Sequence, residues 1–126
     1  MKVLICEDEE ILLTAIEFRL RKQGYELALA QDGMAALEQI RHELPDLLVV
    51  DVKTPKLSGL ELIKYIRSEL KSSIPIIVIS SLDQDNVVLE AFQLGATDFI
   101  AKPFKPAELV LRIRKILATN SEEPVS

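Results

Sequence analysis

The chain has 126 residues, 48% of them hydrophobic, and a formal net charge of −5. A chain of this size and composition can bury a normal core as one domain, without metal or disulfide staples. The acidic balance argues against direct nucleic-acid binding by this chain, and no apolar run approaches the ~20 residues of a membrane span.

The amino-terminal stretch and the cysteine content both indicate a cytoplasmic protein. Four consecutive acids, Glu7 to Glu10, come too early for a signal-peptide core to precede them. The single cysteine, Cys6, cannot form an internal disulfide, and its place in an apolar run favours a buried, unreactive thiol. We therefore expect a reducing compartment and no membrane partner.

Short runs of apolar and branched residues recur along the chain, each separated from the next by a segment of helical period. This alternation predicts βα units and a parallel sheet. The expected strands are Val3–Cys6, Glu26–Ala30, Leu47–Val50, Pro75–Ile79 and Thr97–Ala101.

Apolar residues at helical spacing predict a helix after each strand. The stripe expected to be buried in the first helix is Ile11, Leu12, Ala15, Ile16 and Phe18. Gly24 can supply the left-handed residue that ends this helix. A shorter stripe between Asp32 and Pro45 predicts a brief second helix.

The later helices carry start and stop signals. Ser58-Gly-Leu-Glu61 has the spacing of a capping box and opens the third helix. The fourth helix is expected to start near Asp83 or Asp85 and to stop at Gly95.

The last helix is expected to begin at Pro106, whose fixed backbone suits a first turn. Its expected buried stripe is Leu109, Ile113, Ile116 and Leu117. The polar stretch 119–126 contains a proline and no apolar stripe, which indicates a disordered end or the start of a linker. We therefore expect the domain to span residues 1–118.

Charged and hydroxyl residues follow several of the strands. Because parallel strands point their carboxyl ends the same way, these residues should share one rim of the sheet, where ligands bind in open α/β folds. They are Glu7, Asp8, Glu9, Glu10, Asp51, Ser80, Ser81 and Lys102. Singly, each has a plainer explanation, such as a turn former for Asp51 or a surface lysine for Lys102. The dipole of a helix start accounts for Glu9 and Glu10 but less well for the two acids before them.

Together, these residue types form a set suited to phosphoryl transfer. Converging carboxylates repel one another unless a cation joins them, and oxygen ligands select a hard ion such as Mg²⁺. The candidate ligands are Glu7, Asp8 and Asp51. Asp51 would be the nucleophile that forms an acyl phosphate, while Lys102 and Ser80 would stabilise the phosphoryl oxygens.

The same residues resemble the response-regulator receiver domain of two-component signalling, the chemotaxis-response-regulator type of fold. The resemblance extends from about Lys2 to Ala118. It is carried by Glu7-Asp8, the spacing of Asp51, Pro55 and Gly59, the pair Ser80-Ser81, and Gly95-Ala96 through Lys102-Pro103-Phe104. It implies a flavodoxin-like (βα)5 fold, with a doubly wound parallel sheet of strand order 2-1-3-4-5 in three layers.

The resemblance also implies a function in a phosphorelay. The donor would be a phosphohistidine on a sensor histidine kinase or a phosphotransfer protein, and the acceptor would be Asp51. Asp8 would bind Mg²⁺ directly, Glu7 would act through water, and the backbone carbonyl of Lys53 would be the third protein ligand. Such a chain is not an enzyme in the ordinary sense, although it promotes its own phosphorylation and autodephosphorylation.

The family's switch couples a hydroxyl after the fourth strand to an aromatic side chain on the fifth, here Ser80 and Phe99. When Ser80 turns toward the phosphoryl group, Phe99 can enter the space that it leaves. The face formed by the fourth helix, the fifth strand and the last helix then changes shape and signals to a downstream protein or output domain. The resemblance further implies a cis peptide bond between Lys102 and Pro103.

The same face suggests a homodimer. Asp98, Glu108 and Arg112 resemble part of the charge set through which the winged-helix transcription-factor branch dimerises. The basic partner expected in the fourth helix is missing, because Glu90 is the only charged residue between Val87 and Phe92.

Two positions depart from the family's pattern. Glu7 is longer than the more usual aspartate, which would shift a water-mediated metal contact. Lys53 occupies a site often filled by methionine and places a cation near the pocket mouth. Our hypothesis is that Lys53 alters the lifetime of the phosphoaspartate. Ser81 keeps the small residue that phosphoryl access requires.

Three rival interpretations remain. A flavodoxin-type FMN module would place a phosphate beside the four acids, which would repel it. A haloacid-dehalogenase-type phosphatase needs a general acid two residues after its nucleophile, where Lys53 stands. A phosphorylation-independent pseudo-receiver would bind partners only, and the complete set of acids, hydroxyl and lysine argues against it.

Overall fold

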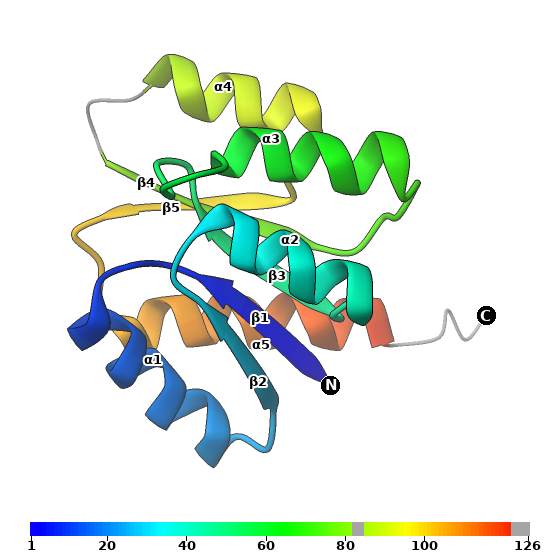
Figure 1. Ribbon diagram of the computed structural model, residues 1–126. Helices are drawn as coiled ribbons and strands as arrows, with labels where there is room; N and C mark the ends of the chain where they lie inside the picture. Colours follow the sequence, from blue (N-terminus) through cyan, green and yellow to red (C-terminus); the bar gives the residue numbers. More distant parts are fainter. Residues whose placement is uncertain (82–84, 122–126) are drawn as a thin grey trace.

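The computed structural model describes residues 1–81 and 85–121, and a parallel sheet runs through its centre (Figure 1). The strands are β1 Lys2–Cys6, β2 Glu26–Ala30, β3 Leu47–Asp51, β4 Ile76–Ser81 and β5 Asp98–Lys102. Within the described residues they form one five-stranded sheet of order β2-β1-β3-β4-β5. All four pairings are parallel. The predicted strand order is confirmed.

Helices cover both faces of the sheet, which confirms the predicted three layers (Figure 1). They are α1 Glu10–Lys22, α2 Gly33–His42, α3 Gly59–Lys64, α4 Asp85–Leu94 and α5 Pro106–Ser121. A π-helical segment, η1 Tyr65–Glu69, continues α3. One face of the sheet packs against α2, α3 and α4, and the other packs against α1 and α5.

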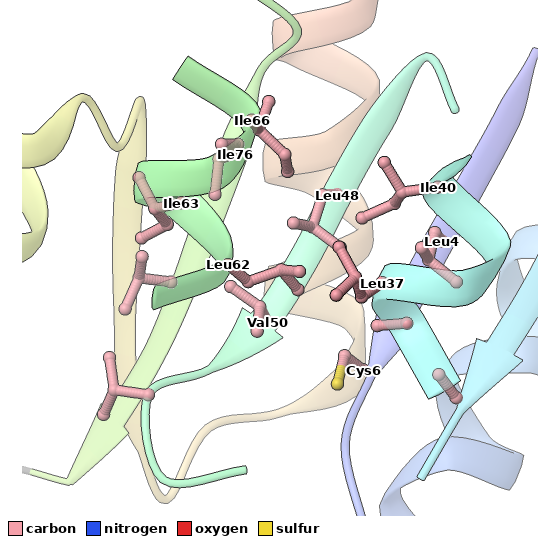
Figure 2. Packing of buried hydrophobic residues seen from close by; sticks show 14 of the residues in the cluster. Leu4, Cys6, Leu37, Ile40, Leu48, Val50, Leu62, Ile63, Ile66 and Ile76 are labelled. Atoms are coloured by element: carbon pink, nitrogen blue, oxygen red, sulfur yellow. The ribbon is translucent and has the colours of Figure 1, made fainter. Parts of the chain in front are cut away.

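The core consists of two apolar clusters, one on each side of the sheet, because successive strand residues point to opposite faces. On the α2–α4 side, Leu4 and Leu48 of the central strands pack with Leu37 of α2 and Leu62 of α3 (Figure 2). Cys6 lies in this cluster and is fully buried. The predicted burial of this cysteine is confirmed. Burial, followed by the charges of nearby acids, raises the pKa of its thiol to about 12.

Several helix ends follow the predicted signals. Ser58 and Glu61 form the capping box at the start of α3. The carboxylate of Asp32 accepts a hydrogen bond from the Ala35 N–H and so caps α2. Gly95 follows the last residue of α4 with φ +116°, a backbone conformation that favours glycine. The start of α4 is Asp85, and the alternative, Asp83, lies outside the described residues.

The predicted buried stripe of α1 was partly wrong. Ile11 and Phe18 are 85% and 64% exposed, whereas Leu13, Ile16 and Leu20 face the sheet. This helix has apolar residues on two sides, so the pattern allowed two orientations. Packing against β2 and α5 buries the side that carries Leu13, Ile16 and Leu20.

Two helix ends differ from expectation. α5 continues three residues beyond Ala118, to Ser121, and residues 122–126 lie outside the described part of the chain. The π-helical turn η1 has no signal in the sequence pattern.

Among the described residues, no helix has both the length and the apolar content that crossing a membrane requires.

Candidate functional site

The carboxyl ends of β1, β3 and β5 bring two acids and a lysine together. The ammonium nitrogen of Lys102 lies 2.9 Å from Oδ2 of Asp51 and 3.1 Å from Oε2 of Glu7. β5 does not adjoin β3, because β4 lies between them. The long lysine side chain therefore reaches across the end of β4, where Lys102 is in register with Ser81.

Glu7 is the buried acid of the site, with no exposed surface. Its Oε1 accepts hydrogen bonds from the backbone N–H groups of Asp8 at 3.0 Å and Glu9 at 3.3 Å. Its Oε2 makes no hydrogen bond of acceptable geometry within the described residues, although the ammonium group of Lys102 is close. Burial first, and then the charge of Asp51, raises the pKa of Glu7 to about 7, while Lys102 opposes this rise.

Lys102 remains firmly charged in this setting. Partial burial acts to lower its pKa, but the hydrogen bonds and negative charges of Asp51 and Glu7 outweigh burial and raise it. A third carboxylate, that of the exposed Glu9, lies 3.6 Å from the ammonium nitrogen. One cation thus stands among three acids, and the site has an excess of negative charge.

Asp51 ends β3 with a side chain that is 13% exposed, so that its carboxylate is accessible and yet held in place. Its Oδ1 accepts a hydrogen bond of 2.9 Å from the Lys53 N–H. Its backbone carbonyl faces Gly59, where a Cβ atom would lie 2.7 Å from the oxygen. The start of α3 can approach the strand end this closely only because residue 59 is a glycine.

Asp8 and Ser80 occupy different environments. Asp8 is exposed, and its N–H group helps to hold Glu7. Ser80 is 1% exposed at the end of β4, and its hydroxyl donates a hydrogen bond of 3.3 Å to the Ser81 carbonyl. Its register partner on β5 is Ala101, one residue before Lys102. The end of β4, which carries the Ser80 hydroxyl, therefore lies beside the end of β5, which carries Lys102.

Phe99 lies on β5, paired in register with Val78. Since Val78 and Ser80 are two residues apart on one strand, Phe99 and Ser80 belong to the same face of the sheet. The ring of Phe99 is half-buried and meets Phe92 of α4 edge-on, with ring centroids 6.5 Å apart. The aromatic side chain implied as a switch is therefore in contact with α4.

Beside Phe99, the three charged residues singled out for dimerisation meet one another within the chain. Arg112 lies 2.9 Å from Asp98 and 3.3 Å from Glu108. It also donates a hydrogen bond to the Phe99 carbonyl at 3.1 Å. On the next loop, the Lys102–Pro103 peptide bond is cis, as the resemblance implied.

The donor set at the rim fits a hard cation in its chemistry. It offers carboxylate oxygens in excess, one of them the buried Oε2 of Glu7 without a hydrogen bond. Among the described residues, however, no three acid, histidine or cysteine side chains stand together at metal-binding spacing.

Two contacts at the rim were not predicted. Sequence reasoning treated Glu9 only as a helix-start acid, yet its carboxylate reaches Lys102. It also missed that the amino end of α2 touches the loop after β3, through a hydrogen bond of 2.9 Å from the Gly33 N–H to the Pro55 carbonyl. No local pattern signals a contact between segments so far apart in the chain.

Comparisons with known proteins agree with this geometry. The family model described as the response regulator receiver domain matches residues 3–114. The chain is 38% identical over 116 residues to the alkaline phosphatase synthesis transcriptional regulatory protein PhoP of Bacillus subtilis, an alignment that covers 92% of this chain and 48% of the relative. The chain spans about half the length of the curated relatives it matches.

Solved structures give the same result. The receiver domain of the Francisella response regulator 1452 matches with a TM-score of 0.84 and 30% identity, covering 96% of this chain and 98% of that one. The receiver domain of the sensor histidine kinase PA1611 from Pseudomonas aeruginosa matches with a TM-score of 0.78 and 31% identity, covering 90% and 94%. That structure has a magnesium ion in its active-site cleft. With a receiver fold, a receiver-type rim and a family match over most of its length, the chain belongs to the response regulator receiver domains of two-component systems.

Proposed function

We propose that Asp51 accepts a phosphoryl group from the phosphohistidine of a sensor histidine kinase or phosphotransfer protein. The observation that carries this proposal is the placement of the Lys102 ammonium group 2.9 Å from the accessible Asp51 carboxylate. A lysine in this position pairs with the carboxylate and can neutralise negative charge that develops when the carboxylate acts as a nucleophile.

In the transfer step, a carboxylate oxygen of Asp51 forms a bond to phosphorus while the P–N bond to the donor histidine breaks. The product is an acyl phosphate, and a carboxylate nucleophile needs no general base. Lys102 shifts its contact from the carboxylate to a phosphoryl oxygen, and the Ser80 hydroxyl donates to another. Lys102 and Ser80 thus both contact the phosphoryl oxygens, which carry the negative charge during the transfer.

We assign the metal site to Asp8, Asp51 and the backbone carbonyl of Lys53, with Glu7 acting through a bound water. Mg²⁺ bound there supplies charge neutralisation for the phosphoryl oxygens. Support comes from the excess of carboxylate oxygens at the rim and from the magnesium ion in the cleft of the PA1611 receiver domain. The same residues would serve autodephosphorylation, in which water replaces the aspartate on phosphorus.

Lys53 is proposed to tune the lifetime of the phosphoaspartate, since it is an exposed lysine two residues after Asp51. The comparison of wild type with Lys53→Met tests this role, read as the rate of loss of the phosphoryl mass in the presence of Mg²⁺ after acetyl phosphate has been removed. Different rates support it, and equal rates contradict it.

The signal is proposed to leave through Ser80, Phe99 and the surface of α4, β5 and α5. The contact of Phe99 with Phe92 supports this route, because a change at Phe99 must be felt on α4. The recipient would be a downstream protein or an output domain beyond the receiver domain at 1–118, joined through 119–126. A homodimer through Asp98, Glu108 and Arg112 is a second proposed use of this surface, and we place the protein in the cytoplasm.

The central experiment is incubation with acetyl phosphate and Mg²⁺, followed by intact mass measurement. We expect a Mg²⁺-dependent gain of one phosphoryl group, absent in Asp51→Asn and retained in the control Asp46→Asn. Asp46 suits the control because it lies before β3 and accepts a hydrogen bond from the Lys2 N–H, away from the rim. A wild type that gains no mass, and shows no response to beryllofluoride, would instead be a pseudo-receiver.

A further inference from the structure

The amino end of α2 holds the loop that follows Asp51. The Gly33 N–H, at the first residue of α2, donates a hydrogen bond of 2.9 Å to the Pro55 carbonyl. Its neighbour Asp32 caps the helix and also lies 3.5 Å from the ammonium nitrogen of Lys56. Two successive residues of one segment thus contact two successive residues of the other.

Gly33 allows an approach that no other residue would permit. A Cβ atom at this position would lie 1.9 Å from the Leu57 carbonyl oxygen and 2.7 Å from the Leu57 carbonyl carbon. Both are backbone atoms, so no side-chain rotation could relieve the clash, and the loop itself would have to move. The need for glycine here is therefore one of space.

The same loop is tied back to the acceptor residue. The Thr54 hydroxyl donates a hydrogen bond of 2.8 Å to the Leu57 carbonyl, the atom that Gly33 faces. The Thr54 N–H donates to the Asp51 carbonyl at 3.2 Å, and the Lys53 N–H donates to Asp51 Oδ1 at 2.9 Å. A displacement of Leu57 is therefore passed through Thr54 to the residues that carry the carboxylate and the Lys53 carbonyl.

We propose that Gly33 is a positioning residue of the Asp51 site: the close contact of its backbone with Leu57 sets the loop 52–58 in the conformation that binds Mg²⁺. This inference rests on the proposed function, because Mg²⁺ is the ligand whose affinity it predicts. Gly33 touches neither the metal nor the phosphoryl group, and it acts only through the loop.

The test compares Gly33→Ala with Gly24→Ala. Gly24 has φ +90° and no atom within 4 Å of the point that a Cβ would occupy, so alanine there strains the backbone far from the rim without pushing on a neighbour. Mg²⁺ dissociation constants are measured from the amide NMR shifts of residues 51–54, at a temperature where every variant is folded. We expect Gly33→Ala to bind Mg²⁺ about tenfold more weakly than wild type, while Gly24→Ala stays within about twofold.

A second variant covers the case in which Gly33→Ala does not fold. Thr54→Val keeps the buried volume and removes the hydroxyl that holds Leu57. It should weaken Mg²⁺ binding about threefold, and in EDTA the Lys53 amide should exchange its hydrogen faster than in wild type or Gly24→Ala. In this metal-free measurement, the comparison with Gly24→Ala separates a change in the loop from a general loss of stability.

The outcomes separate the two proposals. A wild type without any Mg²⁺-dependent shift at residues 51–54 overturns the proposed function and the inference with it. If wild type binds Mg²⁺ but Gly33→Ala matches Gly24→Ala, or if Thr54→Val leaves both the affinity and the Lys53 exchange unchanged, only the positioning role of Gly33 is overturned.

Discussion

The β1–β3 side of the molecule and the edge formed by β5 and α4 are built differently. Apart from their end residues, β1 and β3 are buried throughout, and at their carboxyl ends Glu7 and Asp51 accept hydrogen bonds from the backbone. β5 is half-buried along most of its length, and α4 beside it exposes Leu89 and Phe92. The carboxylates of Glu7 and Asp51 therefore lie on the firmly packed part, and Phe99 and α4, proposed for signalling, lie on the part with room to change. Lys102 joins the two, because it reaches from β5 to the carboxylates. Substitutions in the two regions should separate these properties.

The largest expected effect is on stability, and it compares one leucine from each region. Leu48→Ala leaves a cavity at a fully buried position of β3 and should lower the free energy of unfolding by about 2–5 kcal/mol. Leu89→Ala, at a 59% exposed position of α4, should change it by less than about 0.5 kcal/mol. Urea unfolding measures both, and similar losses would remove the contrast.

The second prediction removes the cation of the rim. Lys102→Met should slow phosphorylation by acetyl phosphate about 100-fold, because the developing charge loses its ammonium partner. The control is Lys105→Met, an exposed lysine on the next loop, which should keep the wild-type rate. Intact mass against time measures the rates, and equal rates for the two variants would contradict the role of Lys102.

The third prediction uses the raised pKa of Glu7. In the folded protein Glu7 takes up a proton near pH 7, whereas in the unfolded chain it does so near its ordinary value of 4.5. Between these values the folded state binds more protons, so metal-free protein should gain stability as the pH falls from 8 to 5.5, by about 1–2 kcal/mol.

Urea unfolding in EDTA at the two pH values measures this gain. The charged groups that act on the pKa of Glu7 are Asp51, Lys102 and Asp8. Glu7→Gln has no proton to take up, so it should lose most of the pH dependence and be the more stable protein at pH 8. A wild type that loses stability over the same interval would show that Glu7 is ionised throughout.

The smallest expected effect concerns the aromatic contact on the signalling side. Phe92→Leu removes the edge-on contact with Phe99 but keeps an apolar side chain, and should cost about 1 kcal/mol of folding stability. The Phe99 ring signals in NMR should shift while the Lys53 amide does not. A shift at Lys53 would show that the two regions are coupled even without phosphorylation.

The sequence predicted the strands correctly where both faces of the sheet are buried. The runs at β1, β3 and β4 contain enough consecutive apolar residues to predict strands, and the turn residues after them predicted where the rim lies. The prediction failed in α1, where Ile11 and Phe18 are exposed, because an amphipathic helix with apolar residues on two sides does not determine its own orientation.

The sequence by itself determined the strand order, through its resemblance to the family, and the kinds of groups at the strand ends, because these follow from local runs and spacings. Only the tertiary structure decided that Glu7 is buried while Asp8 is exposed, and that Lys102 spans β4 to reach Asp51. It alone brought Gly33 against Leu57. Such contacts join residues far apart in the chain, and their distances depend on how the sheet and helices pack, which no local pattern records.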